Sequence, residues 1–322
     1  MAETLEGASR AAGPEGAPPP ALAALARPEL AALMVDASRV ALGRRLGAGA
    51  HATVYAAALL PAEDGARGAA GRARPGGRLV AKCLDRTGPG HLGQVAREIE
   101  LLALAGRHPN ILQLHGWFWR PPPPDGAGPG AASAGRDGDG LGAAAGGGGG
   151  GAGRAPVLCL LLERCEGGTL GAILKSRAGA GDAEAPPQPF PEDTVMGWFV
   201  QLLLALDRLH SIHVCHRDIK PENILLCGGH RILKLADLGV STLLDSANPL
   251  AETCMGTPAY TAPEVIAGRP YSTAADVWSA GCTLVEMAAR RPAFDARGLP
   301  QAMPTAPPTS AGPAAARQPP RH

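Results

Sequence analysis

The 322-residue sequence is poor in lysine, asparagine and aromatic residues, and it lacks a long apolar run. An apolar N-terminal segment, residues 21–35, is interrupted by Arg27, Pro28 and Glu29, so it is neither a spanning helix nor a good signal peptide. The net charge is +1, and no basic block stands out. We therefore expect neither nucleic acid nor a membrane among the partners of this chain.

The seven cysteines show neither CxxC pairs nor the spacing of zinc ligands, and their number is odd. Cysteines scattered in this way are typical of intracellular proteins, in which thiols stay reduced. The sequence therefore predicts reduced thiols and a cytoplasmic or nuclear location.

Glycine and proline are abundant instead, with 44 and 32 residues. They gather in segments that cannot bury enough apolar surface to offset the entropy of ordering. We expect a flexible N-terminal tail, a structured domain over residues 39–298 and a flexible C-terminal tail. The tails comprise residues 1–38 and 299–322, and similar inserts lie near residues 61–78, 121–156 and 176–190.

Between these segments, the spacing of apolar residues predicts strands first and helices later. Alternating apolar residues predict strands in RVALGRRLGAGAHATVYAAAL on both sides of a glycine turn, and also in RLVAKCLD, NILQLHGWF and VLCLLLE. Helical spacing appears in QVAREIELLALAG and in EDTVMGWFVQLLLALDRLH. This order favours an α+β fold with two lobes, a β-rich first lobe and a mainly helical second one.

The segment HVCHRDIKPENILL concentrates rare residues beside an aspartate. Lys220 is one of four lysines and Asn223 one of three asparagines, and both lie within five residues of Asp218. A polar turn before a strand would explain any three of these residues alone. Other motifs decide between that interpretation and a catalytic one.

Glycines at Gly47 and Gly49 precede a β-branched strand, with Ala52 where a third glycine of GxGxxG would fall. A dinucleotide site would need a helix directly after the glycines, so a hairpin whose bare backbone covers phosphates fits better. Lys82 lies in an apolar strand, where a surface lysine is less expected. Glu98 on the following helix can supply the carboxylate that this cation needs.

Further along the chain, KLADLG places Asp237 at a turn after a strand. Asp237 and Asn223 offer oxygen ligands that suit Mg²⁺. Asp218 is then available to accept a proton from an attacking hydroxyl, and Lys220 to neutralise charge on a phosphoryl group. These residue types together indicate phosphoryl transfer.

The same motifs, in the same order, are those of a known family, and the chain resembles a eukaryotic protein kinase of the Ser/Thr type from Val40 to Phe294. The motifs are LGAGAHATV, LVAK, REIELL, LLERCEGGTL, HRDIKPEN, ADLG in place of the usual DFG, GTPAYTAPE and DVWSAGC. The resemblance implies a two-lobed kinase-like fold, ATP and Mg²⁺ as cofactors, and protein substrates with Ser or Thr acceptors.

The resemblance also implies a role for each site residue. Asp218 is the catalytic base, Lys220 assists it, and Lys220 favours Ser/Thr over Tyr specificity. Asn223 and Asp237 hold the metal. His216 is expected to be a core histidine. The residues implied in nucleotide binding are Leu46, Gly47, Gly49, Val54, Val80, Lys82, Glu98, Glu163, Cys165 and Leu225.

A regulatory role is implied for Thr253, which lies where family members often carry an activating phosphate. Arg217 is the arginine that would meet this phosphate. Thr242 stands where a second basic group often helps, so an ordinary loop threonine remains the alternative.

One departure from the family concerns the end of the chain. After RPAFDAR the family continues with several helices, whereas here a Pro/Ala-rich segment follows. We expect Glu264 to lack its usual arginine partner, and Val277, Leu284, Val285 and Met287 to be left partly uncovered. A poorly active kinase or an ATP-binding scaffold is therefore the alternative function, with a chaperone or self-association covering the exposed surface.

Overall fold

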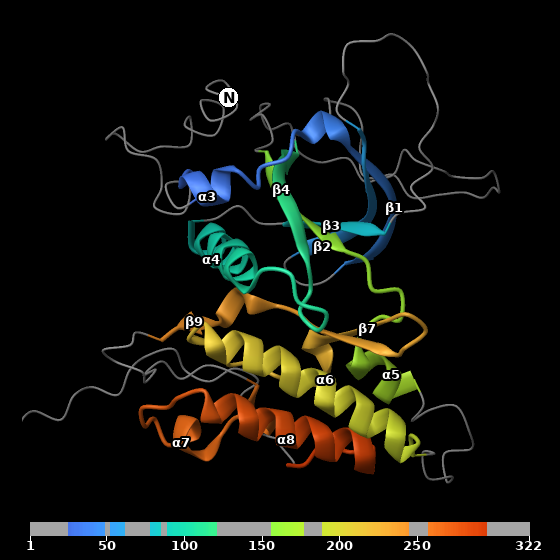
Figure 1. Ribbon diagram of the computed structural model, residues 1–322, viewed down its shortest axis with the longest axis vertical. Coiled ribbons are helices and arrows are strands. Elements are labelled where there is room, and N and C mark those ends of the chain that lie inside the picture. The colour runs from blue at the N-terminus through green and yellow to red at the C-terminus, as the bar shows by residue number, and fades with distance from the viewer. Residues whose placement is uncertain are drawn as a thin grey trace, which may run out of the picture. The chain divides into compact units, whose positions relative to one another are not determined.

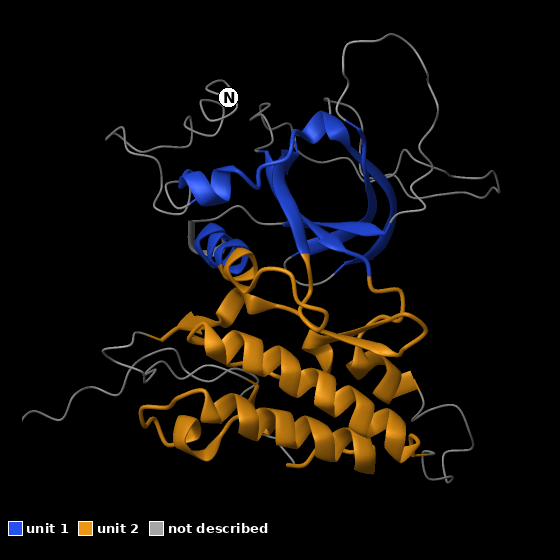
Figure 2. Cartoon of the chain, viewed as in Figure 1, with its two compact units in different colours: residues 1–100, 114–164 blue, residues 101–113, 165–322 orange. Residues whose placement is uncertain are grey.

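The computed structural model describes residues 25–48, 52–61, 78–84, 89–120, 156–176, 189–244 and 257–294. Two compact units divide the chain, as Figure 2 shows. The first comprises residues 1–100 and 114–164, and the second comprises residues 101–113 and 165–322. Of the residues singled out above, Gly49 and Thr253 lie outside the described ranges.

The first unit is built on a five-stranded antiparallel sheet with the order β1-β2-β3-β5-β4 (Figure 1). The strands are β1 Val40–Ala48, β2 Ala52–Leu59, β3 Leu79–Leu84, β4 Leu114–Arg120 and β5 Val157–Glu163. One face of the sheet carries a core cluster of Ala57, Ala81, Cys83, Phe118, Cys159 and Leu161. Because side chains alternate along a strand, the residues between these point to the opposite face.

Helix α4, Pro89–Ala105, follows β3 and carries an apolar stripe, as its sequence spacing predicts. Val95, Ile99 and Leu102 are all buried. Glu98 lies beside this stripe and is only 4% exposed. A carboxylate buried to this extent needs a partner, and Lys82 of β3 supplies it.

The expected N-terminal tail is wrong for residues 25–38, which pack within the first unit. Helix α3, Pro28–Ala31, and the 3₁₀-helix η1, Ala37–Arg39, lie in this region, and both Leu25 and Leu30 are buried. The indole nitrogen of Trp117 on β4 donates a hydrogen bond of 2.8 Å to the carbonyl oxygen of Leu30. Arg27 also forms an ion pair with Glu100 of α4 at 3.0 Å. Burial of the two leucines, the hydrogen bond and the ion pair all oppose the ordering entropy that composition alone suggested would prevail.

The second unit is mainly helical, and Figure 1 shows α6 and α8 packed side by side. Its helices are α5 Leu170–Ser176, α6 Glu192–Ser211, α7 Pro263–Ile266 and α8 Ala274–Ala289. Two small antiparallel ladders join β6 Val214–Cys215 to β9 Thr242–Leu243, and β7 Ile224–Cys227 to β8 Ile232–Leu235. Three 3₁₀-helices complete it: η2 Pro221–Asn223, η3 Leu238–Val240 and η4 Pro258–Tyr260.

These elements confirm the predicted α+β class, with a β-rich unit and a mainly helical one. Acidic Glu192 and Asp193 stand in the first turn of α6, where the helix dipole favours them. Helix α5 was not predicted, because its seven residues are too few for a clear period. Within the described ranges, no helix is long and apolar enough to cross a membrane.

Two of the apolar side chains expected to be uncovered on α8 are exposed. Val277 is 55% and Val285 45% exposed, whereas Met287 is fully buried, so the expectation is wrong for Met287. The reason is helical geometry. Met287 continues the row that begins at Ala275 and repeats every four residues through Ser279 and Thr283, and this whole row is buried.

Candidate active site

One group of candidate site residues, in the first unit, is an ion pair between β3 and α4. The ammonium of Lys82 lies 2.8 Å and 3.0 Å from the two carboxylate oxygens of Glu98. Lys82 is on the sheet face opposite the core cluster, because the core residues Ala81 and Cys83 flank it along the strand. The structure thus brings together the two residues that the sequence paired.

The same sheet face carries other residues implied in nucleotide binding. Val54 lies opposite Lys82 in the β2–β3 register, and Val80 precedes Lys82 by two residues. Residues opposite one another or two apart share a face, so Val54, Val80 and Lys82 form one surface. Gly47 pairs with Val54 and is exposed on β1, as is Leu46. Val54, Val80 and Lys82 thus make an apolar face with one cation.

The remaining residues implied in nucleotide binding are divided between the units. Glu163 ends β5 in the first unit and is partly buried. Cys165 and Leu225 belong to the second unit, and both are partly buried. A backbone bridge joins Thr169 to Leu225, so the segment after Cys165 runs along β7.

Another group of candidate site residues, in the second unit, surrounds Asp218, between β6 and η2. The ammonium of Lys220 donates to Oδ2 of Asp218 at 2.6 Å. The amide nitrogen of Asn223 donates to the same oxygen at 2.9 Å and to the Asp218 carbonyl at 2.8 Å. The side chain of Asp218 is only 14% exposed. A carboxylate that accepts several charged or amide donors is held in one orientation.

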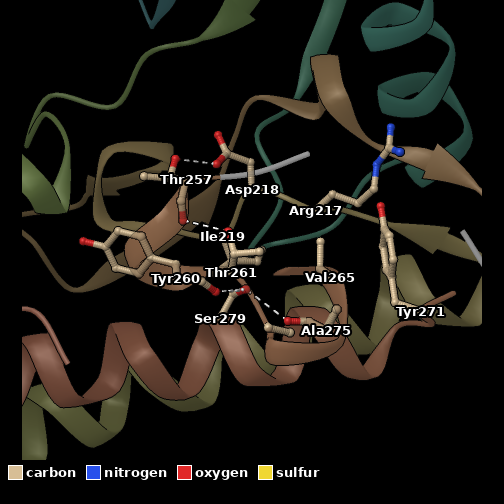
Figure 3. Close-up of a pocket in the computed structure, with 11 residues that line it drawn as sticks. Arg217, Asp218, Ile219, Thr257, Tyr260, Thr261, Val265, Tyr271, Ala275 and Ser279 are labelled. Atoms are coloured by element: carbon tan, nitrogen blue, oxygen red, sulfur yellow. Dashed lines mark hydrogen bonds between the residues drawn. The ribbon is translucent and has the colours of Figure 1, made fainter. Parts of the chain in front are cut away.

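Thr257 is a site residue that the sequence analysis missed. Its hydroxyl donates to Oδ1 of Asp218 at 2.8 Å and accepts from the Lys220 ammonium, also at 2.8 Å, and Figure 3 shows Thr257 pointing at Asp218. The sequence did contain a signal, because Thr257 belongs to the GTPAYTAPE motif. Its contact with Asp218 spans 39 residues, which no local pattern predicts.

Asp276 of α8 fixes the backbone that precedes Asp218. Its carboxylate accepts hydrogen bonds from the backbone nitrogens of His216, at 2.9 Å, and Arg217, at 2.8 Å. His210 of α6 lies 2.9 Å from the same carboxylate. Burial alone would raise the pKa of Asp276, but the hydrogen bond from His210, the His216 ring and the two backbone donors outweigh it and lower this pKa.

This anchoring supports a strained backbone. Arg217 has a φ angle of 68°, in the left-handed region that non-glycine residues seldom adopt. Such conformations persist where surrounding contacts over-determine them, and they gather at functional sites. His216 is fully buried, as expected for a core histidine, and its ring nitrogen Nε2 lies 3.1 Å from the Ala236 carbonyl oxygen.

Arg217, the predicted regulatory residue, lines a pocket together with Asp218, Thr257 and Tyr271 (Figure 3). Its guanidinium Nε donates to the Val240 carbonyl at 2.6 Å. Burial raises the pKa of Tyr271 in the same pocket, although the nearby Arg217 opposes this shift. A contact of Arg217 with Thr253 lies outside the described residues.

Asp237 and Asn223 are the predicted metal ligands. The backbone nitrogen of Ala236 donates to the Asn223 carbonyl at 2.9 Å, which places Asn223 beside the residue before Asp237. Asp237 is exposed and has a φ angle of 65°. The described ranges contain no group of three or more His, Cys, Asp or Glu residues that could hold a metal. The chemistry of the two side chains, one carboxylate and one amide oxygen, suits Mg²⁺, which usually takes one or two protein ligands and fills its shell with waters and substrate phosphates.

A model of the protein kinase domain matches residues 41–303, well over half of the chain. The chain belongs to the protein kinase family. Known relatives share shorter stretches with it. The human serine/threonine-protein kinase Nek5 is 37% identical over 144 residues, which are 45% of this chain and 19% of Nek5.

Two further relatives come from other organisms. Serine/threonine-protein kinase nekl-2 of Caenorhabditis elegans is 39% identical over 143 residues, 44% of this chain and 40% of the relative. Serine/threonine-protein kinase Nek6 of Oryza sativa subsp. japonica is 43% identical over 141 residues, 44% of this chain and 24% of the relative. The matches thus span less than half the length of each of these relatives.

Proposed function

We propose that this kinase-family chain transfers the γ-phosphoryl group of ATP to Ser or Thr hydroxyls of protein substrates, with Mg²⁺ as the second cofactor. The observation that carries the proposal is the network around Asp218, in which Lys220, Asn223 and Thr257 all contact one carboxylate. Phosphoryl transfer requires little covalent chemistry from the protein and much positioning, which a fixed carboxylate and a neighbouring ammonium supply.

In this mechanism Asp218 accepts the proton of the attacking hydroxyl. Lys220, 2.6 Å from Asp218, neutralises charge that develops on the transferred group. Lys82, held by Glu98, positions the phosphates of the nucleotide. Asn223 and Asp237 would hold Mg²⁺, which supplies charge neutralisation on the phosphates when bound.

Two observations support specificity for Ser and Thr acceptors. Lys220 bridges Asp218 and Thr257, so the carboxylate is bordered by a short hydroxyl and a cation. The three relatives described above are each named as serine/threonine-protein kinases. The alternative, an ATP-binding scaffold, would need neither Lys220 nor Thr257 beside the base, so this network supports catalysis.

The test is transfer of labelled phosphate from ATP to a mixture of peptides with Ser, Thr or Tyr as the sole acceptor, with and without Mg²⁺. We expect label on the Ser and Thr peptides that depends on Mg²⁺, and no label with Asp237→Ala. Label on the Tyr peptide alone would contradict the specificity. Binding of ATP without transfer to any peptide would favour the scaffold function.

A further inference from the structure

Two cysteines that are distant in sequence meet in the second unit. The sulfur atoms of Cys165 and Cys227 lie 2.7 Å apart, although 62 residues separate them. Cys165 stands two residues after the end of β5, and Cys227 is the last residue of β7. This distance exceeds the roughly 2.0 Å of a disulfide bond by only about 0.7 Å.

The backbone holds the two cysteines together. The nitrogen of Gly167 donates to the Leu226 carbonyl, and the nitrogen of Leu226 donates to the Gly168 carbonyl, both at 2.9 Å. Gly167 permits this close approach, because a Cβ there would lie 2.6 Å from the Leu226 carbonyl oxygen. Formation of a bond between the sulfurs therefore needs only a small movement of side chains, since the segments are already aligned.

A second pair of cysteines provides the comparison. Cys83 and Cys159 face each other across β3 and β5, and both are buried. A hydrogen bond from Cys83 and burial both raise the pKa of the Cys159 thiol far above its ordinary value, which disfavours the reactive thiolate. Of the six cysteines within the described ranges, Cys165 alone is not buried. Solution oxidants therefore reach the Cys165–Cys227 pair and not the Cys83–Cys159 pair.

We propose that Cys165 and Cys227 form a reversible disulfide, with hydrogen peroxide as the oxidant. Peroxide oxidises the Cys165 thiol to a sulfenic acid and releases one water. The Cys227 thiol then attacks the sulfenic sulfur, the S–S bond forms, and a second water leaves. A thiol reductant such as glutathione restores both thiols by exchange.

The disulfide ties the segment after β5 to β7, and a consequence for nucleotide binding follows that rests on the proposed function. The backbone of Cys165 is implied in adenine binding, and so is Leu225, two residues before Cys227. A covalent link would restrict both residues at once. Asp218, Lys220 and Thr257 contact neither cysteine through the hydrogen bonds of their network. Oxidation should therefore change the affinity for ATP and leave the turnover number largely unchanged.

Peptide mapping tests the modification without any assay of activity. The full chain is reduced, freed of reductant, treated with peroxide, alkylated under denaturing conditions and digested with trypsin without reduction. Trypsin places each cysteine of interest on a separate peptide. The Lys220–Pro221 bond resists cleavage, so the peptide that contains Cys227 begins at residue 218. The peptides for the proposed pair are residues 165–175 and 218–231, and those for the buried pair are residues 83–86 and 155–164.

We expect peptides 165–175 and 218–231 to appear linked, two hydrogens lighter than their sum, and to separate after reduction. The buried pair should stay alkylated in the protein that was folded during oxidation and become linked only when peroxide is added after denaturation. Recovery of Cys165 as a sulfinic acid with Cys227 alkylated would overturn the proposal. Random pairing among all cysteines would also overturn it.

Binding of a non-hydrolysable ATP analogue with Mg²⁺ tests the consequence. We expect the dissociation constant to change at least threefold on oxidation of the wild type and to be insensitive to peroxide in Cys227→Ser. A linked peptide with an unchanged dissociation constant would overturn the link to the nucleotide. If the reduced protein transfers no phosphate but the linked peptide still forms on oxidation, the result would count against the proposed function alone.

Discussion

The Lys82–Glu98 pair in the first unit and the Asp218 network in the second hold their charged groups in different ways. Glu98 is buried and has one charged partner, supplied across 16 residues by a strand and a helix. Asp218 has three side-chain partners, two of them within five residues along the chain. Removing one member of a buried pair leaves the other charge without compensation, whereas removing one member of a network leaves the other hydrogen bonds in place. Variants in the two places should therefore separate stability from catalysis.

The largest effect is expected at the centre of the network. Asp218→Asn removes the base and should lower kcat about 10³-fold, because general base catalysis typically contributes about 10² to 10⁴. The Michaelis constant for ATP should change little, since Asp218 acts on the acceptor hydroxyl. Steady-state kinetics measure both values. Asp207→Asn on the exposed side of α6 is the control, and equal kcat for the two variants would refute the assignment of the base.

The Lys82–Glu98 pair should combine two losses. Lys82→Met should lower activity about a hundredfold and destabilise the fold by about 2 kcal/mol, because it leaves the buried Glu98 carboxylate without its cation. The double variant Lys82→Met, Glu98→Leu should recover most of the stability and none of the activity. Thermal melting and phosphate transfer measure the two effects. Lys175→Met, at a lysine whose side chain is 75% exposed, should change both only slightly, and recovered activity in the double variant would exclude the phosphate role.

Asp276 should make the loop around Asp218 sensitive to acid. Its pKa is lowered in the folded state, so its contribution to stability is present above the ordinary aspartate pKa and lost as the pH falls through the lowered value. Asp276→Asn should cost about 2 kcal/mol at pH 7, since it weakens hydrogen bonds to a charged acceptor. The difference between wild type and variant should shrink below about pH 4. Melting curves between pH 3 and 7 measure this, and a difference independent of pH would contradict it.

A smaller effect is expected at Thr257, whose hydroxyl contacts both Asp218 and Lys220. Thr257→Ala should lower kcat about tenfold, because it removes one of the hydrogen bonds that orient Asp218 and a contact of Lys220, worth about 1.4 kcal/mol. Thr257→Ser keeps the hydroxyl and should restore kcat. Melting temperatures should differ little between the two variants. An equal loss of kcat in Thr257→Ser would show that the methyl group, and not the hydroxyl, matters.

The smallest effect is expected in the first unit, where β4 holds the N-terminal segment. Trp117→Phe removes the hydrogen bond to Leu30 and should cost about 1 kcal/mol of stability. Trp119 on the same strand is a matched control, because its buried indole nitrogen has no hydrogen-bond partner within the described residues. Trp119→Phe should therefore cost less than Trp117→Phe. Denaturant titration measures both, and the reverse order would contradict the docking of residues 25–38.

Most of the fold could be predicted from the sequence, because its elements have clear periods. Alternation predicted the sheet strands, although β4 begins at Leu114 and not at Asn110. Helical spacing predicted α4 and α6. Residues 25–38 were assigned to a tail, because alanine and proline dominate their surroundings and the two buried leucines form no periodic stripe.

The sequence by itself determined the local part of the site. Asp218, Lys220 and Asn223 lie within six residues, so one extended segment and one turn bring their side chains together wherever the segment lies. The order of the motifs was enough to pair Lys82 with Glu98. Proximity along the chain is therefore what a sequence can report about a site.

Only the tertiary structure decided the contacts between distant segments. Thr257 meets Asp218 across 39 residues, Asp276 meets Arg217 across 59, and Cys227 meets Cys165 across 62. No period or motif encodes these contacts, because they depend on how α8, η4 and β7 pack around the Asp218 loop. Packing of this kind is settled by buried surface and hydrogen-bond geometry, which exist only when the chain is folded.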